Sequence, residues 1–346
     1  MNKIYFLLFF ISVSVLQADV YKLGRGYELY KDDELSLALG GHMDSNLHTL
    51  SSQGESVQLG QAGIMLSGEY RQKIRFLVEV GSDDIVTYNI TNNTSQTTPI
   101  KLMRLYAEYL LNDAFEIKAG QFLTPIGIWN KTYIPALRWS NFTPYVAKGF
   151  FPKIIAGASL NGRVLDSRAL SYSIFYHVDG EHDTNDNNVK AKEFIGGELR
   201  YHFSPLGKIA LPFGAYRSDS SQEIIKFGGL NFLLPYHHNE LSSEFLYKDG
   251  TWTNNAGLKN DWKDYAWYVQ YIQHLNDSSY LSFRYGEERR ISSSSSRVWK
   301  DENIVTGYIY RPVSAFSTKL EYRHRKRSGV NALKSDEALL SFSVLF

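Results

Sequence analysis

The sequence predicts an all-β protein, a transmembrane antiparallel β-barrel of about 16 strands with an inward-folded third loop. Three observations support this prediction. Apolar and polar residues alternate along many short segments, short and long connections take turns along the chain, and the last alternating segment ends on Phe346. Alternation with a period of two indicates strands with one apolar face, and a membrane barrel turns such a face toward lipid.

The N-terminus has the three-part pattern of a cleaved export signal. Lys3 gives a positive start, residues 4–16 form an apolar run, and Ala18 is a small residue at the expected cleavage site. The run is too short and too early for a stable membrane-spanning helix. We therefore expect a signal peptide over residues 1–18, a short periplasmic segment over 19–33 and the barrel over 34–346. The alternative is an uncleaved N-terminal anchor.

The composition excludes several classes of protein. Loss of residues 1–18 removes Lys3 and no other charge, which leaves 36 basic and 36 acidic side chains. Such a balance gives no basis for binding nucleic acid. The chain has no cysteine, which excludes disulfides and thiolate metal sites, and no cofactor is expected.

The C-terminal segment shows the most specific pattern. Its apolar residues occupy every second position and alternate with Glu337, Ser341 and Ser343; they are Ala338, Leu340, Phe342, Val344 and Phe346. This arrangement resembles the C-terminal signature by which outer-membrane barrels are recognised for insertion. Phe342, Val344 and Phe346 are therefore assigned as an insertion signal, with the outer-membrane insertion machinery as its partner. The alternative is the last strand of a soluble sandwich.

Upstream segments alternate in the same way, for example over residues 74–80, 103–111, 170–176, 195–203, 265–271 and 281–285. Short connections occur near residues 112–113, 166–167, 204–207, 235, 276–278 and 312. Long polar ones cover 44–55, 82–99, 123–153, 179–192, 249–261, 290–297 and 326–335. Bacterial barrels have short periplasmic turns and longer outer loops. Counting gives sixteen strands with both chain ends periplasmic. A count of fourteen or eighteen strands is also possible, because the bounds of three strands are less clear, those at Leu35, Ile64 and Ile225.

The longest connection, residues 123–153, is too apolar for a solvated loop. It holds four of the nine prolines, Trp129, Trp139 and several further aromatic residues. A loop of this composition needs a surface to pack on. Its position after the fifth strand therefore suggests that it folds into the barrel.

Charge is segregated in the same part of the chain. Residues 117–165 contain no Asp or Glu but six basic residues: Lys118, Lys131, Arg138, Lys148, Lys153 and Arg163. Cations on a loop inside the lumen would act as an electrostatic filter that favours anions. The candidate residues of a pore constriction are Lys131, Arg138, Lys148, Lys153, Arg104 and Arg75. The alternative is a basic outer loop against lipopolysaccharide phosphates, and inward-facing glutamates that pair with wall cations would weaken a filter.

One segment carries a family resemblance. Gly120, Phe122, Pro125 and Gly127 match the G-x-F-x-x-P-x-G segment of the phosphate-selective, O/P-like porin family, over residues 116–127. The N-terminal coiled coil and the lysine ladder of that family are not found here. The resemblance therefore implies an outer-membrane porin that assembles as a homotrimer, and it does not imply phosphate specificity.

Together these observations predict a porin in the outer membrane of a Gram-negative bacterium. It would form a water-filled channel for passive diffusion of small hydrophilic solutes, with a preference for anions, and would contact the lipid bilayer and lipopolysaccharide. A non-conducting barrel that acts as an adhesin or structural protein is the alternative. A membrane-embedded phospholipase or protease is disfavoured, because no His-Asn-Ser or Asp-His set occurs at strand spacing, and the chain is not expected to be an enzyme.

Overall fold

The computed structural model describes residues 26–50, 54–112, 114–164, 167–178, 189–219, 223–253, 259–292, 295–329 and 332–346. The predicted signal peptide, residues 1–18, and the first part of the predicted periplasmic segment lie outside these ranges. Among the residues described, no helix is long and apolar enough to cross a membrane.

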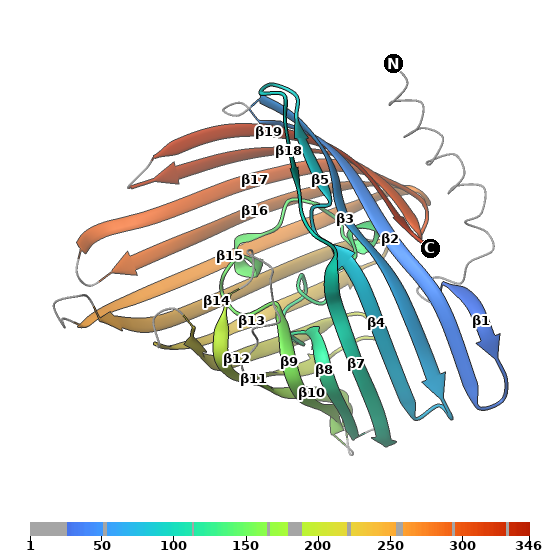
Figure 1. Cartoon of the computed structure of the whole chain (residues 1–346). Helices are drawn as coiled ribbons and strands as arrows, with labels where there is room; N and C mark the ends of the chain where they lie inside the picture. The colour runs from blue at the N-terminus through green and yellow to red at the C-terminus, as the bar shows by residue number, and fades with distance from the viewer. Residues whose placement is uncertain are drawn as a thin grey trace.

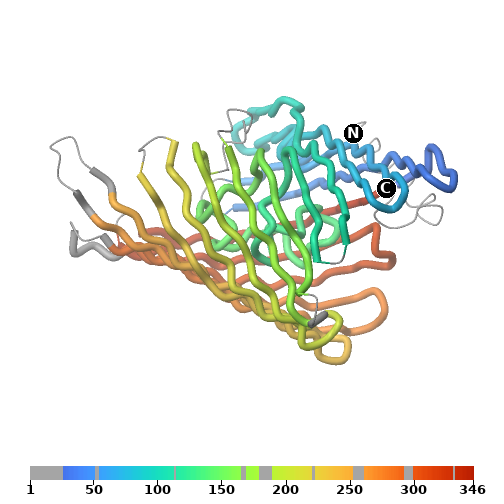
Figure 2. The backbone as a smooth tube through the Cα atoms, turned by 90° about the horizontal axis from the view of Figure 1, so that it is seen from below, coloured from blue at the N-terminus to red at the C-terminus, as the bar shows by residue number. Residues whose placement is uncertain are grey.

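Within the described residues, sixteen strands form a closed antiparallel barrel, as predicted. Each strand pairs with the next along the wall, and β19 pairs with β2 to close the sheet. Figures 1 and 2 show this red and blue pair of strands side by side. The wall strands are β2 (Leu35–Leu50), β3 (Gly54–Tyr70), β4 (Ile74–Ser82), β7 (Lys101–Asn112), β8 (Phe115–Leu123), β9 (Ile154–Val164), β10 (Ser167–Val178), β11 (Ala191–His202), β12 (Lys208–Ser218), β13 (Ile224–Tyr236), β14 (Asn239–Thr253), β15 (Lys259–Asn276), β16 (Ser279–Ser292), β17 (Ser295–Val313), β18 (Phe316–Ser328) and β19 (Leu333–Leu345).

Three short strands extend this wall. β1 (Tyr27–Lys31), within the predicted periplasmic segment, pairs with the start of β2 as a hairpin. β5 (Val86–Asn89) and β6 (Thr94–Thr97) form a second hairpin, in which β5 pairs with the start of β3. The two hairpins lie at opposite ends of the β2–β3 pair, and Figure 1 shows β5 at the top and β1 at the lower right.

Several predicted loops are shorter in the structure because strands run into them. The sequence predicts a loop over residues 44–55, but β2 continues to Leu50 and β3 begins at Gly54. Strand pairing also enters the predicted loops over 82–99, 249–261, 290–297 and 326–335. Backbone hydrogen bonds need no apolar side chain, so the ladder continues where the side chains become polar. Polarity alone therefore misplaces the strand ends.

The side chains are distributed as in a membrane barrel, with apolar residues outside and polar residues inside. Ile64 is 61% exposed and Leu320 is 57% exposed, whereas Glu79, Asp264 and Lys319 are fully buried. A water-soluble protein shows the opposite arrangement. The alternation therefore gives the wall a lipid-compatible exterior and a polar interior.

Candidate functional site

The loop between β8 and β9 lies inside the barrel, as Figure 1 shows for the green segment in front of β13–β15. We call residues 124–153 the constriction loop. It contains two 3₁₀ turns, η2 (Pro135–Leu137) and η3 (Tyr145–Ala147). Side chains from several wall strands hydrogen-bond to its backbone, namely Glu198, Glu244, Lys248, Arg284, Arg311, Lys319 and Glu321. The prediction of an inward-folded third loop is confirmed.

Apolar packing fixes both ends of the constriction loop to one side of the wall. Its apolar side chains and those of β10–β15 form one buried cluster. Phe151 stacks on Phe227 of β13 with ring centroids 5.8 Å apart. The loop members of the cluster are Ile126, Tyr145, Val146, Phe150 and Phe151. The apolar composition of this segment is therefore explained by packing against an apolar sector of the inner wall.

Two wall glutamates fix the beginning of the constriction loop. Glu198 Oε2 accepts a hydrogen bond from the backbone N of Gly127 at 2.8 Å, and Glu244 accepts bonds from the backbone N of Ile128 and Trp129. Gly127 has a φ of +81°, and a Cβ at this position would lie 2.9 Å from Glu244 Oε1. A glycine is thus required where the loop turns against the wall.

Polar contacts hold the middle of the constriction loop on the other sides of the lumen. Lys319 Nζ donates to the carbonyl O of Pro135 and to Asn141 Oδ1, each at 2.7 Å. Glu321 Oε2 accepts a bond from the backbone N of Asn141 at 2.8 Å. Tyr133 donates its hydroxyl to Asp83 at 2.8 Å. The loop therefore crosses the lumen and narrows it.

Cavities remain on the lumen side of this loop. The acid-walled cavity, of about 490 Å³, is lined by Asp44, Asp83 and Asp84 on the wall side and by Arg138, Lys148 and Lys153 on the loop side. The basic cavity, of about 390 Å³, is lined by Lys131, Arg138, Arg200, His202 and Lys208, with Glu240 as an acidic member. Trp129 and Arg138 line both cavities.

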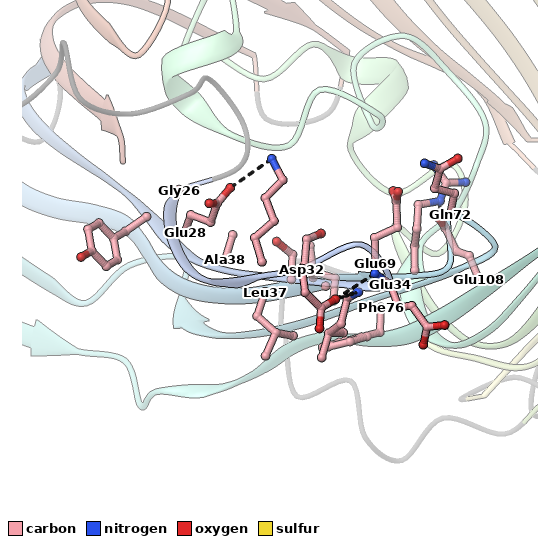
Figure 3. A pocket seen from close by; sticks show the side chains of 18 of the residues that line it. Gly26, Glu28, Asp32, Glu34, Leu37, Ala38, Glu69, Gln72, Phe76 and Glu108 are labelled. Atoms are coloured by element: carbon pink, nitrogen blue, oxygen red, sulfur yellow. Dashed lines mark hydrogen bonds and ion pairs between the residues drawn. The ribbon is translucent and has the colours of Figure 1, made fainter.

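A further cavity of about 880 Å³ lies at the turn end of β2, β3 and β4. Figure 3 shows carboxylates that line it, among them Glu28, Asp32, Glu34 and Glu69. Asp32 accepts bonds from the backbone N of Glu34 and Leu35, which fixes the β1–β2 turn. The acidic lining of this 880 Å³ cavity contrasts with the cationic lining of the basic cavity next to the constriction loop.

The structure brings three of the predicted constriction residues to one cavity. Arg138, Lys148 and Lys153 all line the acid-walled cavity. Arg138 donates its Nε to the carbonyl O of Thr132 and lies over the rings of Trp129 and Tyr133, at 5.3 and 5.8 Å from their centroids. Within the described residues, Arg138 and Lys148 have no carboxylate partner.

Lys131, Arg104 and Arg75 lie elsewhere. Lys131 lines the basic cavity, where its Nζ lies 2.6 Å from Glu198 Oε1. Arg104 pairs with Glu79 and lies 5.5 Å from the ring centroid of Tyr133.

Arg75 lies at the turn end of β4, 3.2 Å from Glu108 and 2.6 Å from Glu116. It does not join the cations of the loop. The pore role of all six predicted residues stays a prediction.

The residues of the predicted insertion signal lie on β19 and at its end. Phe342 and Val344 are half-buried, between the buried Ser341, Ser343 and Leu345. Phe346 is 45% exposed, and its backbone N and O bond to Gly41 at 2.8 and 2.6 Å. The chain end is therefore fixed to β2 at the seam of the barrel.

Lys148 and Asp84, which line the acid-walled cavity, have shifted pKa values. Lys148 is exposed, but desolvation inside the barrel, aided by repulsion from Arg323 and Arg325, lowers its pKa to about 8. Partial burial, aided by repulsion from Asp83 and Asp44, raises the pKa of Asp84 to about 6. Near neutral pH both groups are mainly charged.

The acids of this cavity were not found by sequence reasoning. Asp44 and residues 83–84 fall in segments that the sequence predicts as outer loops. In the structure Asp44 continues the inward set of β2 after His42 and before Asn46, and all three are buried. Little in the sequence signals this, because Asp44, Ser45 and Asn46 are all polar and interrupt the apolar alternation after Met43.

Glutamates of the wall also have a role other than the one expected. The sequence suggests that inward glutamates pair with neighbouring strand cations, and Arg323 does pair with Glu337. Glu198, Glu244 and Glu321 also bind backbone groups of the constriction loop, and Glu198 pairs with Arg200 as well. Within the described residues, no group of three His, Cys, Asp or Glu side chains is arranged to hold a metal ion.

Comparisons by sequence give no family for this chain. No protein-family model matches it, and no curated protein is similar to it in sequence. The resemblance to phosphate-selective porins therefore stays a prediction.

Solved structures share the architecture. OmpT, an outer membrane protein of Vibrio cholerae, is similar with a TM-score of 0.69 at 9% identity, over 93% of this chain and 100% of that one. The anion-selective porin from Comamonas acidovorans has a TM-score of 0.65 at 12% identity, over 90% and 100%. The outer membrane channel DcaP of Acinetobacter baumannii has a TM-score of 0.65 at 10% identity, over 93% and 100%.

These likenesses extend over nearly the whole of each chain. Identities near 10% carry no residue roles from those proteins, but they show the fold. The exposed apolar side chains of the wall fit the membrane in which those proteins reside. The chain thus has the fold of the β-barrels of the Gram-negative outer membrane, and porins are among the structures similar to it.

Proposed function

We propose that this chain is an outer-membrane porin, a water-filled channel for passive diffusion of small hydrophilic solutes. The observation that carries the proposal is the constriction loop inside a closed barrel, with charged cavities beside it. Trp129 and Arg138 line both cavities, so a solute that passes the loop from one cavity to the other passes these two side chains. In the proposed channel the path past these side chains is narrow and polar, and such a path selects solutes by size and charge.

The proposed channel prefers anions. In the acid-walled cavity three acids face three cations, whereas in the basic cavity the cations outnumber the acids. Glu198 binds Lys131 and Arg200, but the remaining cations leave the basic cavity positive. A net positive field attracts anions most strongly at low salt. A similar structure bears the name anion-selective porin, in agreement with this proposal.

The proposed assembly is a homotrimer in the outer membrane, in contact with lipid and lipopolysaccharide. A trimer form of OmpT is among the similar structures. In this proposal residues 1–18 are removed on export, residues 19–33 stay periplasmic, and Phe342, Val344 and Phe346 are read by the insertion machinery. A trimer predicts bands on unheated gels that collapse to the monomer on boiling.

Single-channel recording of the refolded mature chain in a planar bilayer, under a KCl gradient, tests this function. Stable current steps with a reversal potential on the chloride side are expected. Current steps without a chloride preference would refute the anion preference, but the proposal that the chain is a porin would stand.

A non-conducting barrel is the second candidate. It is favoured by the contacts of the constriction loop with β11, β14, β16, β17 and β18, because a loop held on so many sides can close the lumen. A folded barrel that inserts without current steps would refute the porin, and the structural or adhesive reading would replace it.

A further inference from the structure

The acid-walled cavity presents opposite charges on facing walls. Asp44 comes from β2, and residues 83 and 84 follow β4, whereas Arg138 and Lys148 come from the constriction loop. Asp44 and Asp83 are near enough to Arg138 to interact with it electrostatically. No direct ion pair joins Asp44 or Asp84 to Arg138 or Lys148 within the described residues, so these charges are separated by the space of the cavity.

Polar groups that line this space have hydrogen-bonding capacity to spare. The side chains of Asp84 and Lys148 have no hydrogen-bond or ion-pair partner in the described part of the chain, and the side-chain bond of Arg138 uses its Nε. Gln61 lines the cavity and is only 7% exposed, yet its Nε2 has no partner. A buried donor without a partner costs free energy, which a ligand or water that accepts its bond recovers.

Other contacts hold the charged groups in fixed positions. Asp44 accepts bonds from Asn46 and from the backbone N of Gln61, each at 2.6 Å, and Asp83 accepts the bond from Tyr133. The guanidinium of Arg138 lies over the rings of Trp129 and Tyr133. Fixed groups of this kind lose little entropy on binding, which favours recognition of a ligand with matching charges.

The cavity volume, about 490 Å³, lies in the range of small-molecule sites. A simple anion would meet repulsion from the wall acids, and a simple cation would meet repulsion from the loop cations. A solute that carries both charges gains attraction from both walls. Within the described residues the acids do not form a group that could hold a metal ion.

We propose that the acid-walled cavity is a binding subsite for zwitterionic solutes of the amino-acid type. The carboxylate of the solute lies at Arg138 and Lys148, and its ammonium group lies at Asp84. This inference rests on the proposed porin function and names a solute class for one part of the channel.

Block of the KCl current by four solutes of equal size tests the proposal. The solutes are alanine, a zwitterion; lactate, an anion; alaninamide, a cation; and lactamide, which is neutral. The dependence of current block on the concentration of each solute is recorded in single channels at neutral pH. A water-accessible charge pair changes an equilibrium by roughly two- to fivefold, so alanine should reach half-block at a concentration lower by about that factor than lactate or alaninamide.

Variants assign the two ends of the solute. Asp84→Asn should weaken block by alanine roughly two- to fivefold while leaving block by lactate equal or stronger. Lys148→Gln should weaken block by both alanine and lactate. Asp277→Asn, in the turn between β15 and β16 and remote from the cavity lining, is the matched control and should change neither. Heat-modifiable gel mobility verifies that each variant folds.

The outcomes separate this inference from the function on which it rests. Current steps with equal block by alanine and lactamide would overturn the zwitterion subsite and leave the porin. Block by lactate as strong as block by alanine, and insensitive to Asp84→Asn, would overturn it in favour of a plain anion site. Absence of current steps in all preparations would overturn the porin and the subsite together.

Discussion

Replacement of Lys148 by Glu should turn the charge preference of the channel toward cations. The change removes one cation and adds one acid, so the acid-walled cavity would hold two cations against four acids. A unit charge about 4 Å from a permeating ion contributes ~1 kcal/mol in bulk water. A change of two charges is therefore worth up to ~2 kcal/mol for each ion, so at low salt the local chloride concentration should fall by up to about thirtyfold and the local potassium concentration should rise by up to the same factor.

The assay is the reversal potential of the channel under a KCl gradient, first at low and then at high ionic strength. Because the Debye length falls from ~10 Å at 0.1 M to ~3 Å at 1 M, the shift should shrink in concentrated salt. Lys334→Glu, at the start of β19 and absent from the lining of either cavity, is the matched control and should leave the reversal potential unchanged. An unchanged reversal potential in Lys148→Glu at low salt would refute the reasoning that loop cations set the selectivity.

Further predictions concern pH, the loop glycine and the loop anchor. Because the pKa of Lys148 is lowered to about 8, this lysine is charged below that pH and neutral above it. The anion preference should therefore decline between pH 7 and 9, and Lys148→Gln should remove the decline. A wild-type reversal potential that stays constant over this range would contradict this prediction. On heated gels, Gly127→Ala should lower the thermal midpoint of the barrel more than the control Gly149→Ala does. Each glycine has a positive φ, which costs an alanine ~1–2 kcal/mol. A Cβ at 127 would in addition lie 2.9 Å from Glu244, whereas a Cβ at 149 meets nothing within 4 Å. Equal midpoints would show that the loop relaxes away from Glu244. Lys319→Met removes two hydrogen bonds from a buried cation to the constriction loop, each worth ~1.5–3 kcal/mol, and should increase current noise without reversing selectivity; quiet wild-type-like currents would show that the other anchors suffice.

The barrel could be predicted from the sequence because a membrane wall is encoded locally. The two-residue period of apolar residues in a strand such as β19 does not depend on which strands lie beside it, and the terminal Phe346 marks where this pattern ends. The strand ends could not be predicted to the residue. Asp44, Asn46 and His48 look like loop residues, yet they keep the inward parity of β2 and pair with β19, and Asn46 and His48 also pair with β3.

The constriction loop was predictable as a whole but not in its contacts. Its apolar residues and prolines indicate a packed segment, and its four basic residues, with no acidic one, indicate a filter. The partner of each charge depends on how far the loop crosses the lumen, which no local pattern encodes. Lys131 thus meets Glu198, whereas Lys148 meets no carboxylate within the described residues, although the sequence gives both lysines the same predicted role.

The contacts divide the charges of the lumen into two functional classes. Glu198, Glu244 and Lys319 are buried and bind the constriction loop, so their charges are largely compensated and their main effect is on where the loop lies. Arg138 and Lys148 keep unpaired charge toward open cavities, where a permeating ion can approach them. Substitution in the first class should therefore alter conductance and noise, while substitution in the second should alter selectivity at nearly constant conductance. A channel in which Lys319→Met and Lys148→Gln shifted the reversal potential equally would show that loop position and loop charge cannot be separated in this barrel.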